Sequence, residues 1–206
     1  MVGVTRIVFI GDSVTDCGRS GTHTPLGDGY VRMIRDAEHA RHPEVRWINR
    51  GVGGDTVRDL AVRWEPDAIA TAPDVLCVLI GINDVWRAFQ GVPEQAVPLD
   101  EYGATLHDLL VRAVGATGCH VVVAEPYLVE PDRSDPQRLA TERYATRATT
   151  LAAEAGATSV ALQRVFDDAM RRVPPSDLAA DRVHPTPHGH QLIATAFRGA
   201  LASYWC

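Results

Sequence analysis

Short apolar runs alternate along this chain with longer stretches in which apolar residues recur at helical spacing. The short runs predict strands at residues 6–10, 45–48, 74–80, 119–124 and 158–162. The longer stretches predict helices at residues 30–40, 56–70, 99–114, 136–155 and 187–202. An alternation of strands and helices is typical of a parallel sheet that carries helices on both faces. The pattern therefore predicts an α/β fold.

The third strand is the strongest of these predictions. Residues 75–80 are apolar at every position, which is typical of a central parallel strand covered on both faces. Five strands in such an arrangement indicate a flavodoxin-like three-layer α/β/α sandwich with a five-stranded parallel sheet. The chain has 206 residues and contains no repeat, linker or low-complexity tract. We therefore expect residues 1–206 to form a single domain.

Composition excludes several classes of chemistry. All 20 basic residues are arginine, so the chain lacks the lysine that Schiff-base, PLP and P-loop chemistry require. The net charge of −6 argues against nucleic-acid binding, which usually needs a basic face. The N-terminus opens directly on a strand without a signal-peptide pattern, and no apolar run approaches the ~20 residues that span a bilayer. We expect a cytoplasmic protein without a membrane partner.

The four cysteines form no C-x-x-C pair, so neither a zinc ribbon nor a dithiol redox motif is expected. Cys77 and Cys119 lie in apolar runs and are predicted to be buried. Cys17 is a weaker candidate for a thiol nucleophile, because no base is close to it in the sequence.

Candidate chemistry begins where the first strand ends. Glycine, proline and polar residues gather in the loops after the strands, at 18–29, 51–54, 91–98 and 126–136, and such loops build the active site of an open α/β sheet. Gly11, Asp12 and Ser13 follow the first strand directly. Ser13 is placed to act as a nucleophile; alternatively, Asp12 and Ser13 only cap the next helix.

A base for Ser13 is available near the C-terminus. Asp181 and His184 are three positions apart, so one helical or 3₁₀-like turn lets the carboxylate reach the imidazole Nδ1. The other ring nitrogen then faces the serine. A surface ion pair is the structural alternative. A zinc site with His188 and His190 is disfavoured, because residues two apart do not point the same way along a helix.

Two further loops supply candidate oxyanion donors. Gly54 follows the second strand and opens a helix, where its N–H can face an anion. Asn83 follows the third strand and carries a neutral amide donor. Without catalysis, Gly54 is part of a tight turn and Asn83 is a helix cap. The backbone N–H of Ser13 completes the predicted oxyanion hole.

This chain resembles the SGNH (GDSL) hydrolase superfamily in four blocks that occur in the order typical of that superfamily. The blocks are Ser13 in Gly-Asp-Ser, Gly54, Asn83 in Gly-x-Asn-Asp, and Asp181-x-x-His184. The residues around these blocks, such as 14–19, 55–60 and 84–87, resemble those of bacterial intracellular acetylxylan esterases. The resemblance implies a flavodoxin-like fold, a Ser-His-Asp triad and no metal or organic cofactor. Two positions depart from the pattern: Val14 replaces the leucine of GDSL, and Asp55 replaces a frequent asparagine beside the oxyanion region.

The resulting hypothesis is a serine esterase that removes acetyl groups from xylo-oligosaccharides or related sugars. Asp12 and Trp86 are the candidate substrate contacts, whereas Trp47 and Trp64 are predicted to be core residues. The alternatives are a thioesterase, short-chain lipase or lysophospholipase with the same triad, a non-catalytic binding protein and a metal-dependent hydrolase. The expected partner is a small acetylated sugar. The resemblance and the aromatic C-terminal segment, residues 203–206, also suggest a homo-oligomer.

Overall fold

The computed structural model describes residues 5–21 and 24–204, which form one five-stranded parallel sheet. The strand order is β2-β1-β3-β4-β5. The strands are β1 (Arg6–Gly11), β2 (Arg46–Gly51), β3 (Val75–Leu79), β4 (His120–Ala124) and β5 (Thr158–Val160). Gly11, the last residue of β1, pairs in register with Gly51 of β2 and Leu79 of β3. Three neighbouring strands therefore end at one level, and the loops that follow them meet there.

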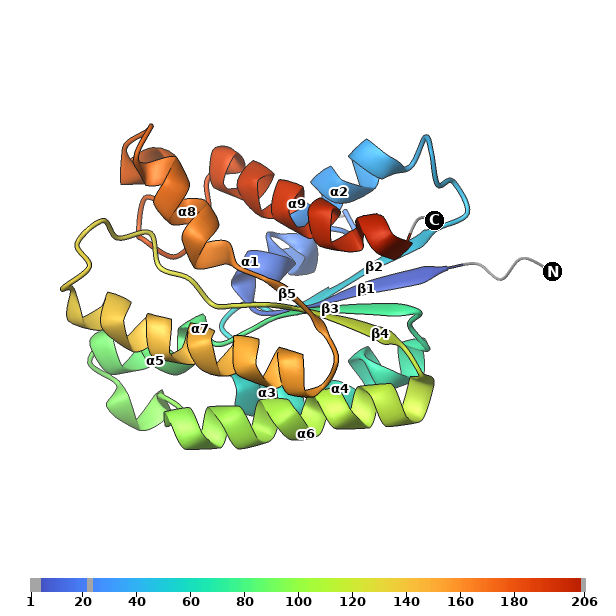
Figure 1. The fold of residues 1–206 in the computed structure, drawn as a ribbon, viewed down its shortest axis with the longest axis horizontal. Helices are drawn as coiled ribbons and strands as arrows, with labels where there is room; N and C mark the ends of the chain where they lie inside the picture. The colour runs from blue at the N-terminus through green and yellow to red at the C-terminus, as the bar shows by residue number, and fades with distance from the viewer. Residues whose placement is uncertain (1–4, 22–23, 205–206) are drawn as a thin grey trace.

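Helices cover both faces of this sheet (Figure 1). The longer helices are α2 (Tyr30–Glu38), α3 (Val57–Val62), α5 (Ile82–Phe89), α6 (Leu99–Thr117), α7 (Pro136–Glu154), α8 (Leu162–Met170) and α9 (Pro187–Leu201). Two four-residue helices, α1 (Ser13–Asp16) and α4 (Trp64–Asp67), follow β1 and α3. Helices α2, α8 and α9 lie on one face, and α3, α4, α6 and α7 on the other. The predicted three-layer α/β/α sandwich is confirmed.

Alternation along the strands separates two apolar cores. In β1, Ile7 and Phe9 point into the layer of α2, α8 and α9, whereas Val8 and Ile10 point into the opposite layer. Trp64 is fully buried in this second core. Trp47 stacks on Phe9 in the first, with ring centroids 6.4 Å apart. The predicted core positions of both tryptophans are therefore confirmed, as is the burial of Cys77 and Cys119.

Two helices escaped the sequence pattern. The pattern predicted no helix at α5, and the alternative role of Asn83 as a cap is wrong, because α5 begins at Ile82 and its N-cap is Gly81, at φ 128°. Leu162 was assigned to the last strand, but β5 ends at Val160 and α8 begins at Leu162. Both helices start within three positions of the end of a strand, so their first apolar residues extend the strand's hydrophobic run. Hydrophobic periodicity cannot separate the two elements there.

The chain ends are only partly described. Tyr204 contacts His120, with ring centroids 5.0 Å apart, and its hydroxyl lies 3.3 Å from that of Thr158. Trp205 and Cys206, which carried part of the oligomer expectation, lie outside the described residues. None of the helices in the described part of the chain is long and apolar enough to cross a membrane.

Helix α1 lies directly on the end of β2. The Asn49 side chain donates to the carbonyl of Thr15 (2.7 Å), and its Oδ1 accepts the N–H of Gly51 (2.8 Å). A Cβ atom at Gly51 would lie 2.1 Å from the backbone nitrogen of Asp16 and 2.6 Å from the carbonyl carbon of Thr15. Only glycine therefore permits this approach of the two backbones.

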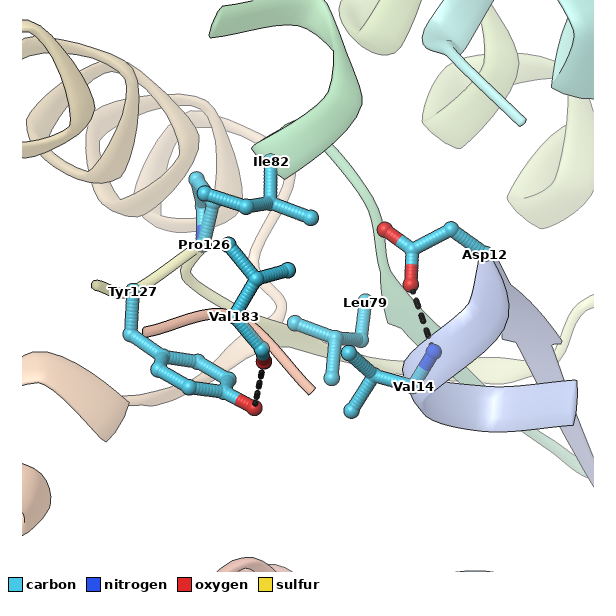
Figure 2. Close-up of a pocket in the computed structure, with 7 residues that line it drawn as sticks. All are labelled: Asp12, Val14, Leu79, Ile82, Pro126, Tyr127 and Val183. Atoms are coloured by element: carbon cyan, nitrogen blue, oxygen red, sulfur yellow. Dashed lines mark hydrogen bonds between the residues drawn. The ribbon is translucent and has the colours of Figure 1, made fainter. Parts of the chain in front are cut away.

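The carboxyl group of Asp12 is buried under the same turn. Its Oδ1 caps α1 by accepting the N–H of Val14 (3.0 Å), a contact visible in Figure 2, and 1 % of the residue is exposed. Its Oδ2 accepts no hydrogen bond from the described residues. Burial, with a smaller contribution from the charges of Asp84 and Asp55, raises the pKa of Asp12 to about 7. Such a position leaves Asp12 little surface to offer a substrate.

We expect Gly51→Ala to lower the free energy of unfolding by about 3 kcal/mol, because α1 must shift away from β2. Urea denaturation measures this change. The matched control is Gly115→Ala on the exposed side of α6, where a Cβ meets nothing within 4 Å. That variant should be stabilised by up to about 1 kcal/mol. Equal effects of the two substitutions would contradict the close approach.

Asp12→Asn should flatten the pH dependence of stability. The pKa of Asp12 rises from 3.8 to about 7 on folding, so the native state binds more protons between these values and stability falls as the pH rises through that window. Asparagine keeps the cap without titrating. The variant should gain on the order of 3 kcal/mol over the wild type between pH 4.5 and 8, measured by urea unfolding. Parallel stability curves for the two proteins would refute this assignment.

Candidate active site

Ser13 is the first residue of α1 and follows the end of β1 by two positions. Its half-buried side chain faces the loop that precedes α9, and its Oγ lies 2.9 Å from Nε2 of His184. The two residues are 171 positions apart in the sequence. The fold thus brings together the serine and the histidine that the sequence pattern singled out.

One carboxylate organises the histidine. Oδ2 of Asp181 lies 2.6 Å from Nδ1 of His184, while Oδ1 accepts the backbone N–H groups of His184 (2.8 Å) and Val183 (3.1 Å). Partial burial alone would raise the pKa of Asp181, but these hydrogen bonds outweigh it and lower the pKa below its usual value. An ionised Asp181 can only accept a hydrogen bond, so a neutral His184 imidazole carries its proton on Nδ1. Nε2 then accepts the hydroxyl proton of Ser13.

The turn between these residues differs from the expectation. Instead of a helical or 3₁₀-like turn, residues 181–184 form an irregular turn in which Arg182 adopts a left-handed conformation, at φ 73°. The bonds from Val183 and His184 to Oδ1 of Asp181 replace the carbonyl bonds of a helix. Short side-chain bonds of this kind compete with helical ones, which is why a spacing of three did not indicate the backbone conformation.

The segment after β4 holds this turn in place. The guanidinium of Arg182 forms ion pairs with Glu130 (3.0 Å) and Asp135 (2.7 Å), and its carbonyl accepts the N–H of Val129 (2.9 Å). The hydroxyl of Tyr127 donates to the carbonyl of Val183 (3.2 Å), as Figure 2 shows. The backbone on both sides of Val183 is therefore tied to a segment that the sheet itself positions.

Asn83 contacts the loop that carries Gly54, and Gly53 of that loop lies next to Ser13. Gly54 adopts a left-handed conformation, at φ 88°, in the loop between β2 and α3. Asn83 is buried in the first turn of α5, and its Nδ2 donates to the carbonyl of Asp55 (2.9 Å). An amide nitrogen carries two N–H donors, so a second one remains for a ligand. The next residue along α5, Asp84, accepts the N–H of Val57 at the start of α3 (3.0 Å).

The charge of Asp55, unexplained by the sequence, is matched by an arginine. Oδ2 of Asp55 lies 2.6 Å from Nε of Arg63, which also donates to the carbonyls of Gly11 (2.9 Å) and Arg50 (2.7 Å). Burial raises the pKa of Asp55, and the contact with Arg63 opposes this. The Asp55–Arg63 pair therefore links the loop of Gly54 to the ends of β1 and β2.

Trp86 lies against the histidine. Its ring meets that of His184 edge to face, with centroids 5.5 Å apart, and it is half-buried. Of the two candidate substrate contacts, Trp86 is therefore at the site surface, whereas Asp12 is inside as a helix cap.

Sequence reasoning missed the partner of Cys17. Nε2 of His190 in α9 lies 3.2 Å from the Cys17 sulfur, while Nδ1 accepts the N–H of Tyr30 (3.2 Å). Burial, helped by the charge of His184, lowers the pKa of His190 to about 4, so its Nε2 proton faces the sulfur. Burial also raises the pKa of Cys17, which disfavours a thiolate nucleophile. The two residues are 173 positions apart, and no local signal connects them.

The zinc alternative lacks geometric support. His188 is exposed and His190 is buried, so the two side chains lie in different environments. Among the residues that the structure describes, no group of three His, Cys, Asp or Glu side chains could hold a metal ion.

Comparisons with known proteins place the chain in a family. Residues 9–192 match the GDSL-like Lipase/Acylhydrolase family. An acetylxylan esterase from Geobacillus stearothermophilus is 38% identical over 209 residues, which cover 97% of this chain and 95% of that protein. Its crystal structure superposes with a TM-score of 0.91 at 38% identity, covering 98% of this chain and 95% of the other.

Other solved structures agree. An α/β hydrolase from the metagenome of Lake Arreo, Spain, has a TM-score of 0.92 at 36% identity, covering 98% of this chain and 97% of that one. Catalytic mutants of the Geobacillus esterase, in which a serine, a histidine or an aspartate is replaced by alanine, have also been solved. In that enzyme the aspartate and the histidine are three positions apart. The present chain belongs to the GDSL-like lipase/acylhydrolase family and is a carboxylic ester hydrolase.

Proposed function

We propose that the protein is a serine esterase that removes acetyl groups from xylo-oligosaccharides or related acetylated sugars. The observation that carries this proposal is the continuous contact from Ser13 through His184 to Asp181, with distances of 2.9 and 2.6 Å. The Geobacillus acetylxylan esterase supports it, because the residue types changed in its catalytic mutants are those of this trio. The spacing of three between aspartate and histidine is also the same.

The proposed mechanism begins with proton transfer. Nε2 of His184 removes the hydroxyl proton as Oγ of Ser13 attacks the acetyl carbonyl, and Asp181 stabilises the imidazolium that forms. The tetrahedral intermediate collapses when the imidazolium protonates the sugar oxygen, and the alcohol leaves. Water, deprotonated by His184, then attacks the acetyl-serine. Collapse of the second intermediate releases acetate and restores the serine hydroxyl.

The developing oxyanion needs donors that are already in place. The backbone N–H groups of Ser13 and Gly54 and the amide of Asn83 are the proposed donors. The bond from Asn83 to the Asp55 carbonyl holds the amide in one orientation before substrate binds. Because the Asn83 amide is neutral and already oriented, it stabilises the oxyanion without placing a charged group that would pair with the imidazole of His184.

The surroundings of the serine favour a short acyl group. A mostly apolar cavity lined by Asp12 and Val14, the two neighbours of Ser13 in the sequence, and by Leu79, Ile82 and Val183 among others has a volume of about 10 Å³ (Figure 2). That volume corresponds to about one water molecule, too small for a long acyl chain. Trp86 offers a half-buried aromatic ring beside His184, which protonates the leaving sugar. A thioesterase or lysophospholipase would need an apolar channel instead.

Asn83→Ala should lower kcat by about 10²–10³-fold with a small change in KM, because one oxyanion donor acts mainly in the transition state. Steady-state kinetics on 4-nitrophenyl acetate measure this effect, and circular dichroism with thermal melting checks that the variant folds. A loss of less than about tenfold would remove Asn83 from the oxyanion hole.

Ser13→Ala should reduce acetate release by at least about 10³-fold. The decisive screen compares acetylated xylo-oligosaccharides, acetylated glucose and 4-nitrophenyl octanoate, with Ser13→Ala as the blank. We expect the acetylated sugars to be hydrolysed and the octanoyl ester to be a poor substrate. Full activity of Ser13→Ala would overturn the mechanism. Faster hydrolysis of the octanoyl ester would favour a lipase or lysophospholipase.

A further inference from the structure

A polar cavity of about 450 Å³ lies beside the Gly54 loop. It is lined by residues 53–56, by Arg58 and Asp59 of α3, by Arg87 of α5, and by Gln95. Cavities that bind small molecules commonly measure roughly 300–1,000 Å³. This one is therefore large enough for a ligand, and it shares Gly54 with the proposed oxyanion hole.

Gly53 connects this cavity to the nucleophile. A Cβ atom at Gly53 would meet one atom within 4 Å, the Cβ of Ser13 at 3.9 Å. Gly53 has no positive φ that would require glycine, and no tight packing excludes a side chain there. The missing side chain leaves open space between Ser13 and the cavity.

The cavity walls differ in how their polar groups are engaged. Nε and Nη2 of Arg58 donate to the two carboxylate oxygens of Glu101 (2.5 and 2.6 Å), and Asp59 accepts from the backbone and hydroxyl of Thr56 (2.9 and 2.7 Å). Arg87 is half-buried and donates from Nη2 to the Gly54 carbonyl over 3.3 Å. A guanidinium has five N–H donors, so most of those on Arg87 remain for a ligand.

We propose that this cavity binds the sugar unit next to the acetylated one, with Arg87 as the specificity-determining residue. This inference rests on the proposed esterase function and adds to it the recognition of the glycan chain. A hydroxylated ring offers many acceptors to the N–H groups of Arg87 and to the Gln95 amide. An acyl chain would cover these groups without bonding them, which is costly.

The charges of the wall favour a neutral ligand over an anion. Arg58 is neutralised by Glu101, and Asp55 by Arg63. Asp59 lies close enough to Arg87 for that charge to help lower the pKa of Asp59, together with its bonds to Thr56 and against a burial that would raise it. Paired charges of both signs match a ligand that donates and accepts hydrogen bonds but carries no net charge.

Helix α5 would then contact two parts of one substrate. Trp86 and Arg87 are consecutive, so their side chains diverge by about 100° around the helix axis. Trp86 meets His184, where the leaving oxygen is protonated, and Arg87 borders the cavity beyond Gly54.

The test measures kcat/KM for three esters: acetylated xylobiose, acetylated xylose and 4-nitrophenyl acetate. It compares the wild type with Arg87→Gln and with a control, Arg112→Gln, which changes an exposed residue of α6. We expect Arg87→Gln to lower kcat/KM on the disaccharide about tenfold more than on the two smaller esters, mainly through KM. The control should retain wild-type ratios. An equal loss on all three esters would show that Arg87 acts only through the Gly54 carbonyl, and would overturn the inference.

A binding experiment separates this inference from the esterase proposal. In the Ser13→Ala background, which leaves the cavity intact, an NMR titration with unacetylated xylobiose should shift the Arg87 and Gln95 side-chain signals. When Arg87→Gln is added to this background, the shifts of the Gln95 signals should no longer saturate with xylobiose. Shifts elsewhere or none at all would overturn the cavity assignment even if the esterase is active. Conversely, cavity binding without Ser13-dependent acetate release would support the sugar site and refute the proposed reaction.

Discussion

The close approach of three backbones at the end of the sheet is the constraint on which the site depends. Gly11 pairs with Gly51 and Leu79, and a Cβ at Gly11 would lie 2.0 Å from the Leu79 carbonyl oxygen. Because neither glycine carries a side chain, α1 can sit on the strand ends, with Ser13 at its first position. The loops after β2 and β3 leave the sheet at the same level. Serine, glycine and asparagine therefore meet without long connecting segments.

Helix α5 shows how one short element can organise several groups. Asn83 holds the Asp55 carbonyl, Asp84 holds the N–H of Val57, and Arg87 reaches the Gly54 carbonyl. These three side chains fasten the loop from Gly54 to the start of α3, while Trp86 faces His184. Burial raises the pKa of Asp84 to about 7, so fastening the loop carries a cost in stability at neutral pH. The fixed conformation of this loop therefore lowers the stability of the folded protein.

The strands, the layers and the loops that carry the candidate site could be predicted from the way short apolar runs alternate with stretches of helical spacing. Parallel strands buried on both faces read as continuous apolar runs, so they stand out in the sequence. What periodicity could not show are elements that begin inside such a run, as α5 and α8 do. It also could not show the left-handed turn at Arg182, whose conformation depends on ion pairs with Glu130 and Asp135. The contact between Cys17 and His190 could not be predicted either, because the two residues meet only when α9 packs on α2. Pairings of this kind are tertiary and leave no local periodic signal.

The distance along the chain between Ser13 and His184 has a consequence for the timing of synthesis. Strand β1 and α1 emerge from the ribosome first, whereas α9 follows the turn of residues 181–184 and packs against α2 at the other end of the sequence. Domains generally fold as units, and contacts of high sequence separation form only after the intervening chain is in place. A nascent chain that has not yet released residues 181–184 therefore carries Ser13 without His184, its proposed base. The proposed triad would therefore be complete only late in synthesis, once the turn of residues 181–184 has met the segment after β4.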